Sequence, residues 1–296
     1  MTGYEALRRR AAWIDLSNRG KIRATGEDRA RLLHALSTND IQNLAPGETA
    51  YAFFLNEKGR IIADAYISNL GDALWLDTEP EIKDTLIQHL DRYIIADDVT
   101  LEDQTDLFAC IAIEGPQAPE LAPKAGLQTN ATTTGQPAVR VFLPVAAKPD
   151  YLARLTELAI PQATSEEARA VRVENGFPRY GEDISDKHLV QETQVGHAVH
   201  SNKGCYLGQE IVERVRSRGQ VHRLLASLRI SGGDPPAPGT KLVSNNAEIG
   251  EITSAAYSPA LGEIVALGYL RREALDAASP VTIAGTDVAV RPRLQA

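Results

Sequence analysis

The feature of this sequence that most restricts its fold is a change of pattern close to residue 222. After that point the chain contains only short strand-like runs, and proline and glycine separate them repeatedly. Short strands with closely spaced turn residues are typical of a small barrel or sandwich. The sequence therefore predicts an all-β unit of about 75 residues that begins near residues 219–222. Its expected strands are 224–230, 240–244, 248–255 and 263–270.

Before residue 222, strand and helix patterns alternate. Residues 14–24 form an irregular strand-like run, and residues 51–55 and 60–68 predict two strands joined by a compact turn at residues 56–59. A helix is expected over residues 165–174, with Ser165 as its cap. Hairpins mixed with helices indicate an α+β body rather than a regular β-α-β repeat.

Charge and cysteine content argue against several classes of protein. The chain has 31 lysine and arginine residues against 39 acidic ones, so its net charge is −8. Direct DNA binding is therefore not expected, because phosphate backbones are held by an excess of basic residues. No apolar run is long enough to span a membrane, and no secretion signal opens the chain. With two cysteines and no metal-ligand spacing, we expect a cytoplasmic protein without a metal site.

No common catalytic signature is present. The chain contains no glycine-rich dinucleotide motif before a helix, no P-loop, no G-x-S-x-G and no H-E-x-x-H. Candidate site residues must therefore be found from their local surroundings.

Asp64 is the first candidate, because it lies on a predicted strand that is apolar on both faces. Period-two alternation places Ile62, Asp64 and Tyr66 on one face. A carboxyl group in such a place either pairs structurally or holds a ligand. Tyr51 begins the partner strand, where a packing role and a ligand-lining role both remain open.

Glu174 is the second candidate, because it stands at the end of the helix predicted over residues 165–174. The C-terminal end of a helix carries partial negative charge, so a carboxylate is unfavourable there. We expect either Arg179 or a donor group of a ligand to offset it.

The segment Lys203-Gly-Cys-Tyr-Leu-Gly-Gln-Glu210 is the densest polar cluster of the chain. Cys205 stands beside Lys203 and just before a predicted helix, a setting that favours a thiolate. A reactive cysteine and a small structural one are both compatible with this pattern, whereas Cys110 lies in an apolar run and is expected in the core. A basic run that includes Arg214, Arg216, Arg218, His222 and Arg223 follows, and it is either a solvated helix face or an anion site.

These segments together resemble the YgfZ family of folate-binding proteins, relatives of the glycine-cleavage T-protein (aminomethyltransferase). The similarity rests on the cysteine segment 203–210, on Thr38-Asn39-Asp40, on the hairpin at 51–64, on Arg172-Val-Glu-Asn-Gly176 and on the C-terminal β region. It implies a three-lobed ring around a folate cavity, with lobes at residues 1–115, 116–220 and 221–296.

The resemblance also assigns roles to residues. It implies that tetrahydrofolate or a one-carbon derivative is the cofactor, with Asp64 facing its reactive nitrogens. Tyr51 would line the pocket, and Glu174 would accept hydrogen bonds from the pterin ring. Asp64 and Cys205 are the expected catalytic residues. We also expect contributions to cofactor binding from the motif and the basic run, by Lys203, Tyr206, Gln209, Glu210, Arg214 and Arg223.

Three functional hypotheses follow. The intact cysteine segment, which the T-protein lacks, favours a folate-binding protein that supports assembly or repair of iron–sulfur proteins, with a possible link to tRNA modification and with iron–sulfur client or assembly proteins as partners. A folate-dependent aminomethyltransferase, which would need Asp64 but not Cys205, is the alternative. The third is an interaction module whose basic run at 214–223 docks an acidic protein or tRNA.

Overall fold

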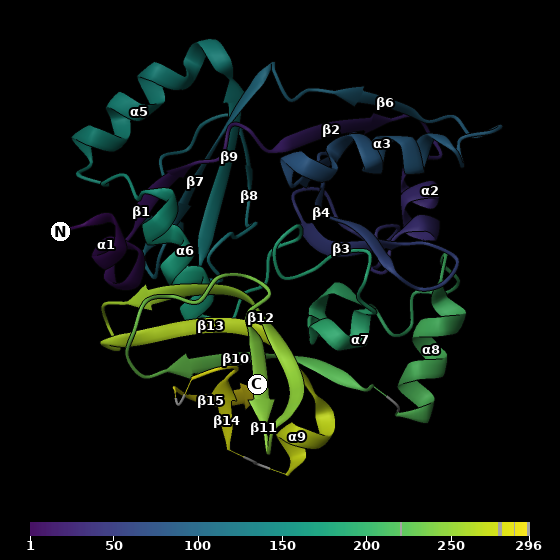
Figure 1. The fold of residues 1–296 in the computed structure, drawn as a ribbon. Helices are drawn as coiled ribbons and strands as arrows, with labels where there is room; N and C mark the ends of the chain where they lie inside the picture. The colour runs from purple at the N-terminus through teal and green to yellow at the C-terminus, as the bar shows by residue number, and fades with distance from the viewer. Residues whose placement is uncertain (220, 278–279, 287, 295–296) are drawn as a thin grey trace.

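The structure is a computed structural model that describes residues 1–219, 221–277, 280–286 and 288–294. Figure 1 shows three groups of elements around a common centre: a four-stranded sheet, a five-stranded sheet and a closed barrel. The predicted α+β class with a C-terminal barrel is confirmed.

The five-stranded sheet is antiparallel, in the order β3-β4-β5-β2-β6. Buried apolar residues of α2, including Leu32 and Leu33, share one core with Phe53 and Phe54 of β3. The predicted hairpin is confirmed, and it is formed by β3 and β4. The elements of this part are β2 (Gly20–Thr25), α2 (Arg29–Leu36), β3 (Thr49–Leu55), β4 (Ile61–Asn69), β5 (Leu74–Thr78), η1 (Pro80–Ile82), α3 (Lys83–Asp91) and β6 (Thr100–Asp103).

The four-stranded sheet has the order β1-β7-β9-β8. Its elements are α1 (Gly3–Arg9), β1 (Ala12–Asp15), β7 (Phe108–Glu114), α4 (Ala118–Leu121), β8 (Leu127–Thr129), β9 (Ala138–Pro144), η2 (Val145–Ala147), α5 (Lys148–Glu157) and α6 (Ser165–Glu174). The cap of α6 is Thr164 rather than the predicted Ser165, because the Thr164 side chain accepts a hydrogen bond from the Glu167 N–H.

Two expectations from the sequence concern strands of this sheet. The run at residues 14–24 is not one strand: β1 and β2 pair in different sheets, and residues 16–19 join them. β7, which ends at Glu114, pairs with β9 along its whole length, so one sheet combines strands from both sides of residue 115. The division of the chain into lobes at residues 1–115, 116–220 and 221–296 stays a prediction.

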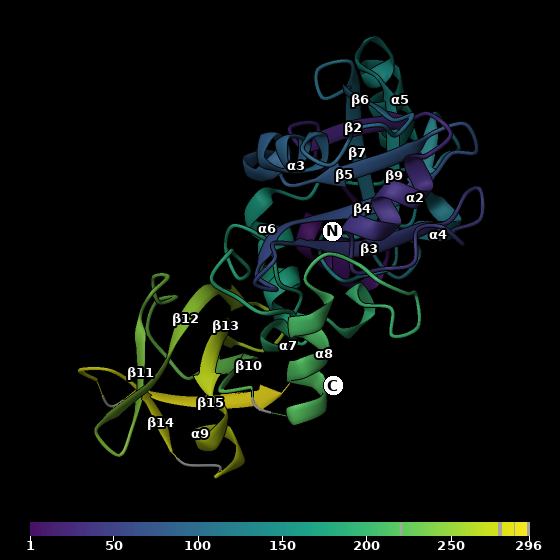
Figure 2. The ribbon, with the colours of Figure 1, turned by 90° about the vertical axis from the view of Figure 1, so that its right-hand side faces the viewer.

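The barrel closes in the order β10-β13-β12-β11-β14-β15, and a connecting segment with α7, η3 and α8 precedes it. Figure 2 shows the barrel as a layer of its own beside the two sheets. Residue 220, at the predicted boundary, lies outside the described residues. The elements are α7 (Val190–Thr193), η3 (Gly196–Ala198), α8 (Gln209–Arg218), β10 (Arg223–Ile230), β11 (Lys241–Ser244), β12 (Ala247–Ser258), β13 (Glu263–Arg271), α9 (Arg272–Asp276), β14 (Val281–Ile283) and β15 (Ala289–Leu294).

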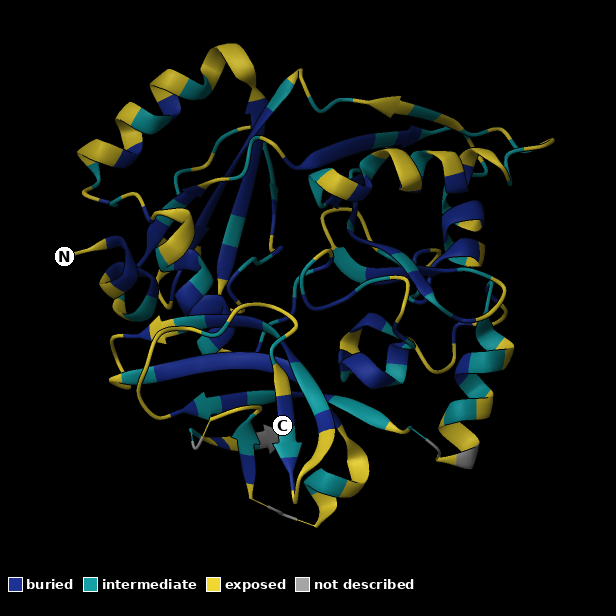
Figure 3. Ribbon diagram, in the orientation of Figure 1, coloured by how far each residue is buried: buried dark blue, intermediate teal, exposed yellow. Residues whose placement is uncertain are grey.

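Burial follows these layers. Figure 3 shows mostly buried strands in the sheets and largely exposed faces on α5 and α8. Within the described ranges, no helix is both long enough and apolar enough to cross a lipid bilayer.

Candidate functional site

Asp64 lies on β4, and its carboxyl group is held by a tyrosine of the neighbouring strand. The hydroxyl of Tyr51 donates a hydrogen bond to Oδ2 of Asp64 at 2.6 Å. In the β3–β4 register Tyr51 is opposite Tyr66, and Phe53 is opposite Asp64. Tyr51 and Asp64 are therefore diagonal neighbours on one face of the sheet, a separation that a tyrosine side chain can span. The predicted shared face of Asp64 and Tyr66 is confirmed, because both line the same narrow space.

Burial makes Asp64 hard to ionise. The residue is only 6% exposed, and burial together with the nearby Glu79 raises the pKa of its carboxyl group to about 7. The hydrogen bond from Tyr51 and the charges of Arg19 and Arg179 oppose this rise but do not cancel it. At neutral pH, Asp64 can therefore both hold and release a proton, as a general acid or base must.

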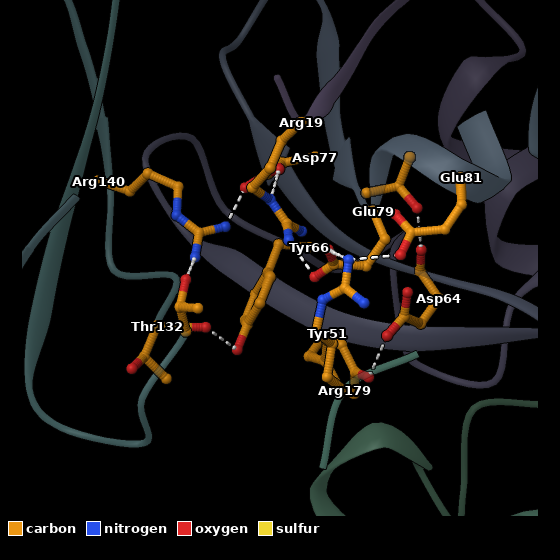
Figure 4. A network of polar contacts seen from close by, with 12 residues as sticks. Arg19, Tyr51, Asp64, Tyr66, Asp77, Glu79, Glu81, Thr132, Arg140 and Arg179 are labelled. Carbon is orange, nitrogen blue, oxygen red and sulfur yellow. Dashed lines mark hydrogen bonds and ion pairs between the residues drawn. The ribbon is translucent and has the colours of Figure 1, made fainter. Parts of the chain in front are cut away.

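A chain of buried ion pairs surrounds this carboxyl group (Figure 4). Arg19 pairs with Asp77 at 2.6 Å and with Glu79, and Arg179 pairs with Glu79 at 2.8 Å. Burial would raise the pKa of Asp77, but Arg140 and Arg19 outweigh it and hold that pKa below its ordinary value. Buried charges are tolerated only when they are paired in this way.

The same network joins the two sheets. Asp77 lies on β5 of the five-stranded sheet, and it pairs with Arg140 on β9 of the four-stranded sheet. Arg140 also donates to Thr133, and the hydroxyl of Tyr66 donates to the carbonyl of Thr132 at 3.0 Å. Polar contacts from both sheets therefore fix the rings beside Asp64.

Asp64 lines a narrow space that shares wall residues with two larger cavities. Tyr51, Tyr66, Phe177 and Pro178 are among the residues that line the narrow space around its carboxyl group. Phe177 and Pro178 also line a cavity of about 450 Å³ that extends toward the barrel. A second cavity, of about 580 Å³, shares the wall residues Arg19, Glu79, Arg172 and Arg179 with the narrow space. Volumes of this size are ordinary for small-molecule sites.

Glu174 lies at the C-terminal end of α6 and lines the 450 Å³ cavity. Its Oε1 accepts a hydrogen bond from the hydroxyl of Tyr4 at 2.5 Å, and its Oε2 lies 3.2 Å from Nη1 of Arg8. Arg179, the neighbour suggested from the sequence, instead pairs with Glu79 and Glu81. Of the two offsets expected from the sequence, Arg179 is therefore wrong, because α1 packs against α6 and supplies the hydrogen bond of Tyr4 and the charge of Arg8; a ligand donor stays a prediction.

The segment Thr38-Asn39-Asp40 links Tyr51 to the connecting segment. The side chain of Asn39 donates to the carbonyls of Tyr51 and His197, at 2.8 Å and 2.9 Å. The hydroxyl of Thr38 donates to the carbonyl of Ala198 and accepts from the N–H of Phe53. As a result the ring of His197, which lines the 450 Å³ cavity, lies 5.7 Å from the ring of Tyr51.

The cysteine segment packs on the outer side of the hairpin. Lys203 is buried, and its ammonium donates to the carbonyls of His34 and Ser37 at the end of α2. Gly208 has φ of +81°, and a Cβ at this position would lie 2.8 Å from the carbonyl oxygen of Asn56 in the hairpin turn. Only glycine allows this close approach, so the segment is fitted to the hairpin that carries Asp64.

The remaining side chains of the segment lie apart from Asp64. Cys205 is exposed, whereas Cys110 is fully buried as predicted, and burial raises the pKa of its thiol to about 12. Tyr206 is buried below the ammonium of Lys203, and Gln209 accepts from the N–H of Tyr206 at 3.4 Å. Within the described ranges, no three histidine, cysteine or acidic side chains are grouped as metal ligands would be.

The basic run is largely neutralised by neighbouring acids. Arg214 pairs with Glu210 and Arg216 with Glu213 on the outer face of α8, and Arg223 pairs with Glu192 of α7. Among the described residues that line the 450 Å³ cavity and the narrow space, neither Arg214 nor Arg223 is present. The structure thus brings Tyr51 and Asp64 together, places Glu174 in the adjoining cavity, and leaves the cysteine segment and basic run outside both.

Sequence reasoning missed several residues of this site. Two of them, Arg19 and Glu79, form an ion pair near Asp64. The other two are His197, whose ring lies beside that of Tyr51, and Tyr4, which donates to Glu174. Glu79 stands before Pro80, at the end of a strand, where a buried acid has no local signal. Tyr4 belongs to a short helix whose partner lies 170 residues away, so no spacing rule could have found it.

Comparison with known proteins identifies both ends of the chain. Residues 2–139 match the GCVT N-terminal domain, and residues 223–294 match the glycine cleavage T-protein C-terminal barrel domain.

Relatives that span most of the chain carry related names. An aminomethyltransferase of Rubrobacter xylanophilus is 28% identical and covers 98% of this chain and 82% of its own length. A probable aminomethyltransferase of Natronomonas pharaonis is 29% identical, over 98% of this chain and 85% of its own length. A putative chloroplast transferase of Arabidopsis thaliana is 26% identical, over 93% of this chain and 68% of its own length.

The crystal structure of glycine cleavage system aminomethyltransferase T from Bartonella henselae superposes with a TM-score of 0.86. It is 19% identical, and the match covers 98% of this chain and 87% of that one. This likeness shows the fold, and it confirms the T-protein-like architecture. The chain therefore contains a segment that matches the GCVT N-terminal domain and a segment that matches the glycine cleavage T-protein C-terminal barrel domain, and it has the aminomethyltransferase-like fold.

Proposed function

We propose that the protein binds tetrahydrofolate, or a one-carbon derivative of it, in the 450 Å³ cavity beside Asp64. One observation carries this proposal: Oε2 of the buried Glu174, on the wall of that cavity, accepts no hydrogen bond from the described residues. A pterin ring presents amino and imino N–H donors that such an oxygen can accept. The family matches support a folate ligand in general.

The chain's own residues would then act at two places. Glu174 would hold the pterin edge, and the rings of Tyr51, His197 and Phe177 would enclose the ligand beside it. Asp64 would exchange a proton with a ligand nitrogen, because its pKa of about 7 matches neutral pH. Bound tetrahydrofolate would supply the nitrogen that carries a one-carbon unit.

For the wider role, we propose support of iron–sulfur protein assembly or repair, with possible effects on tRNA modification and with Cys205 as the functional thiol. The exposed Cys205 in a segment that resembles the YgfZ signature supports this role. Aminomethyl transfer is the second candidate, and the names of relatives from Rubrobacter and Natronomonas support it.

Calorimetric titration with tetrahydrofolate tests the binding proposal. We expect binding by the wild type and a loss of at least about tenfold in affinity in Asp64→Ala, since a buried partner of the ligand is removed. Asp234→Ala, an exposed acid of the barrel, is the control and should bind as the wild type does. No binding by the wild type would refute the proposal.

A second experiment separates the two roles. Cys205→Ala, introduced into a deletion strain, should fail to restore the activity of iron–sulfur enzymes if the thiol is functional. Full restoration would refute the role of Cys205. Turnover of an aminomethyl donor by the purified protein, retained in Cys205→Ala and lost in Asp64→Asn, would establish the aminomethyltransferase instead.

A further inference from the structure

The N-terminal helix α1 reaches the wall of the proposed folate cavity. Tyr4 and Arg8 are four residues apart, so they share one face of α1. Both contact the carboxylate of Glu174, which is 170 residues from Tyr4 in the sequence and whose side chain is only 3% exposed. Tyr4 and Leu7 pack with Ala170 and Val171 of α6 in one apolar cluster, which fixes α1 against that helix.

The two oxygens of Glu174 are engaged differently. Oε1 accepts the hydroxyl hydrogen of Tyr4 at 2.5 Å. That hydroxyl oxygen itself accepts the N–H of Ala260 at 3.0 Å, so its hydrogen is directed to Glu174. Arg8 lies 3.2 Å from Oε2 as an ion pair, yet none of the described residues donates a hydrogen bond to this buried oxygen. One oxygen is therefore occupied and the other keeps its acceptor capacity.

We propose that Tyr4 and Arg8 are positioning residues, which orient Glu174 so that Oε2 is the oxygen offered to an amino group of the ligand. The inference rests on the proposed folate function and adds to it. Without the hydrogen bond from Tyr4, the carboxylate of Glu174 can rotate. The entropy lost when the ligand immobilises it would then weaken binding. Without Arg8, the position of Oε2 is no longer held by charge.

A comparison of two ligands tests this role. The probes are tetrahydrofolate and its 2-desamino-2-methyl analogue, which lacks the amino group that Oε2 would accept. In calorimetry, Tyr4→Phe and Arg8→Gln should each bind tetrahydrofolate about tenfold more weakly, as expected for a hydrogen bond to a charged group. For the analogue the loss should stay below about threefold, because the affected hydrogen bond is absent.

Matched controls keep the result interpretable. Tyr151→Phe removes another buried tyrosine hydroxyl, which donates to the carbonyl of Pro123, and Arg9→Gln changes the exposed neighbour of Arg8. Neither control should alter affinity for either ligand. If Tyr4→Phe fails to fold, Arg8→Gln still decides the matter, because the Arg8 side chain is 34% exposed and adds little to the core.

Equal losses for both ligands would mean a merely structural role, and no loss for tetrahydrofolate would mean no role at all; either result overturns the inference. If the wild type binds tetrahydrofolate and the variants give one of these two results, only this inference is refuted and the proposed function stands. A wild type that binds no tetrahydrofolate refutes the proposed function itself, and this inference with it.

Discussion

The phenolic hydroxyl of Tyr51 and the carboxyl group of Asp64 form a hydrogen bond of 2.6 Å between neighbouring strands, on the wall of one narrow space. The tyrosine holds the acid in place, and burial keeps the acid close to half-protonated at neutral pH. In the proposed function, this pair would be the chemical centre of the site.

The stability of the protein should depend on pH through Asp64. Burial and Glu79 raise the pKa of its carboxyl group from 3.8 to about 7, so between these values the folded chain holds a proton that the unfolded chain has released. Stability from this group therefore falls as the pH rises across that window and is fully lost above it. Asparagine has no carboxyl proton to lose, so Asp64→Asn should not lose stability as the pH rises across this window. We expect the variant to exceed the wild type by about 4 kcal/mol near pH 8 and to match it near pH 4, as measured by urea denaturation. A difference independent of pH would contradict this account.

Asp77 should be far more important for folding than an exposed acid. It accepts from Arg19 and Arg140, both buried, and it connects the two sheets. Asp77→Asn leaves two buried cations short of a counter-charge, which costs about 3–5 kcal/mol. Asp72→Asn removes an exposed partner of Arg23 and should cost less than about 1 kcal/mol. Urea denaturation of both variants checks the contrast, and equal losses would count against the network.

Lys203 should be needed for stability independently of Cys205. Burial lowers the pKa of its ammonium to about 8, and the group donates to two carbonyls at the end of α2. Lys203→Met leaves those carbonyls unpaired, so we expect a loss of about 1–3 kcal/mol in the free energy of unfolding. The exposed Lys124 provides the control variant Lys124→Met, which should be neutral. A neutral Lys203→Met would show that this lysine is not a structural cap.

The two thiols should react very differently with an alkylating reagent. Cys205 is exposed, whereas Cys110 is buried and burial raises the pKa of its thiol to about 12. Native protein should therefore gain a single label, at Cys205, and Cys205→Ala should gain none until it is unfolded. Mass spectrometry of intact and digested protein provides the count. Rapid labelling of Cys110 in the native state would contradict its place in the core.

Local patterns in the sequence were sufficient for the features that depend on neighbouring residues. The hairpin, the shared face of Asp64 and Tyr66 and the core position of Cys110 follow from period-two alternation and from apolar neighbours. The barrel follows from its turn residues, but β14 and β15 were missed, because β14 has only three residues and β15 contains Pro292.

Features that depend on distant contacts were out of reach. The misfit of Glu174 was visible from its helix position, but its partners lie on α1, and the nearer Arg179 is used elsewhere. The cluster of Arg19, Asp77, Glu79 and Arg140 is assembled from three segments that are far apart in the sequence. Ion pairs of that kind have no sequence spacing by which they can be recognised.

The contact of Tyr4 with Glu174 and Ala260 also bears on how the chain acquires its shape. Tyr4 is synthesised long before Glu174 and Ala260, the two residues that its hydroxyl group contacts in the wall of the cavity. Asp64 and Tyr51, which are 13 residues apart, can meet early, but the cavity beside them is closed only when the barrel has formed. Contacts this distant in sequence slow folding. During synthesis, the proposed ability to bind folate should therefore appear only after the barrel residues that line the cavity have been made.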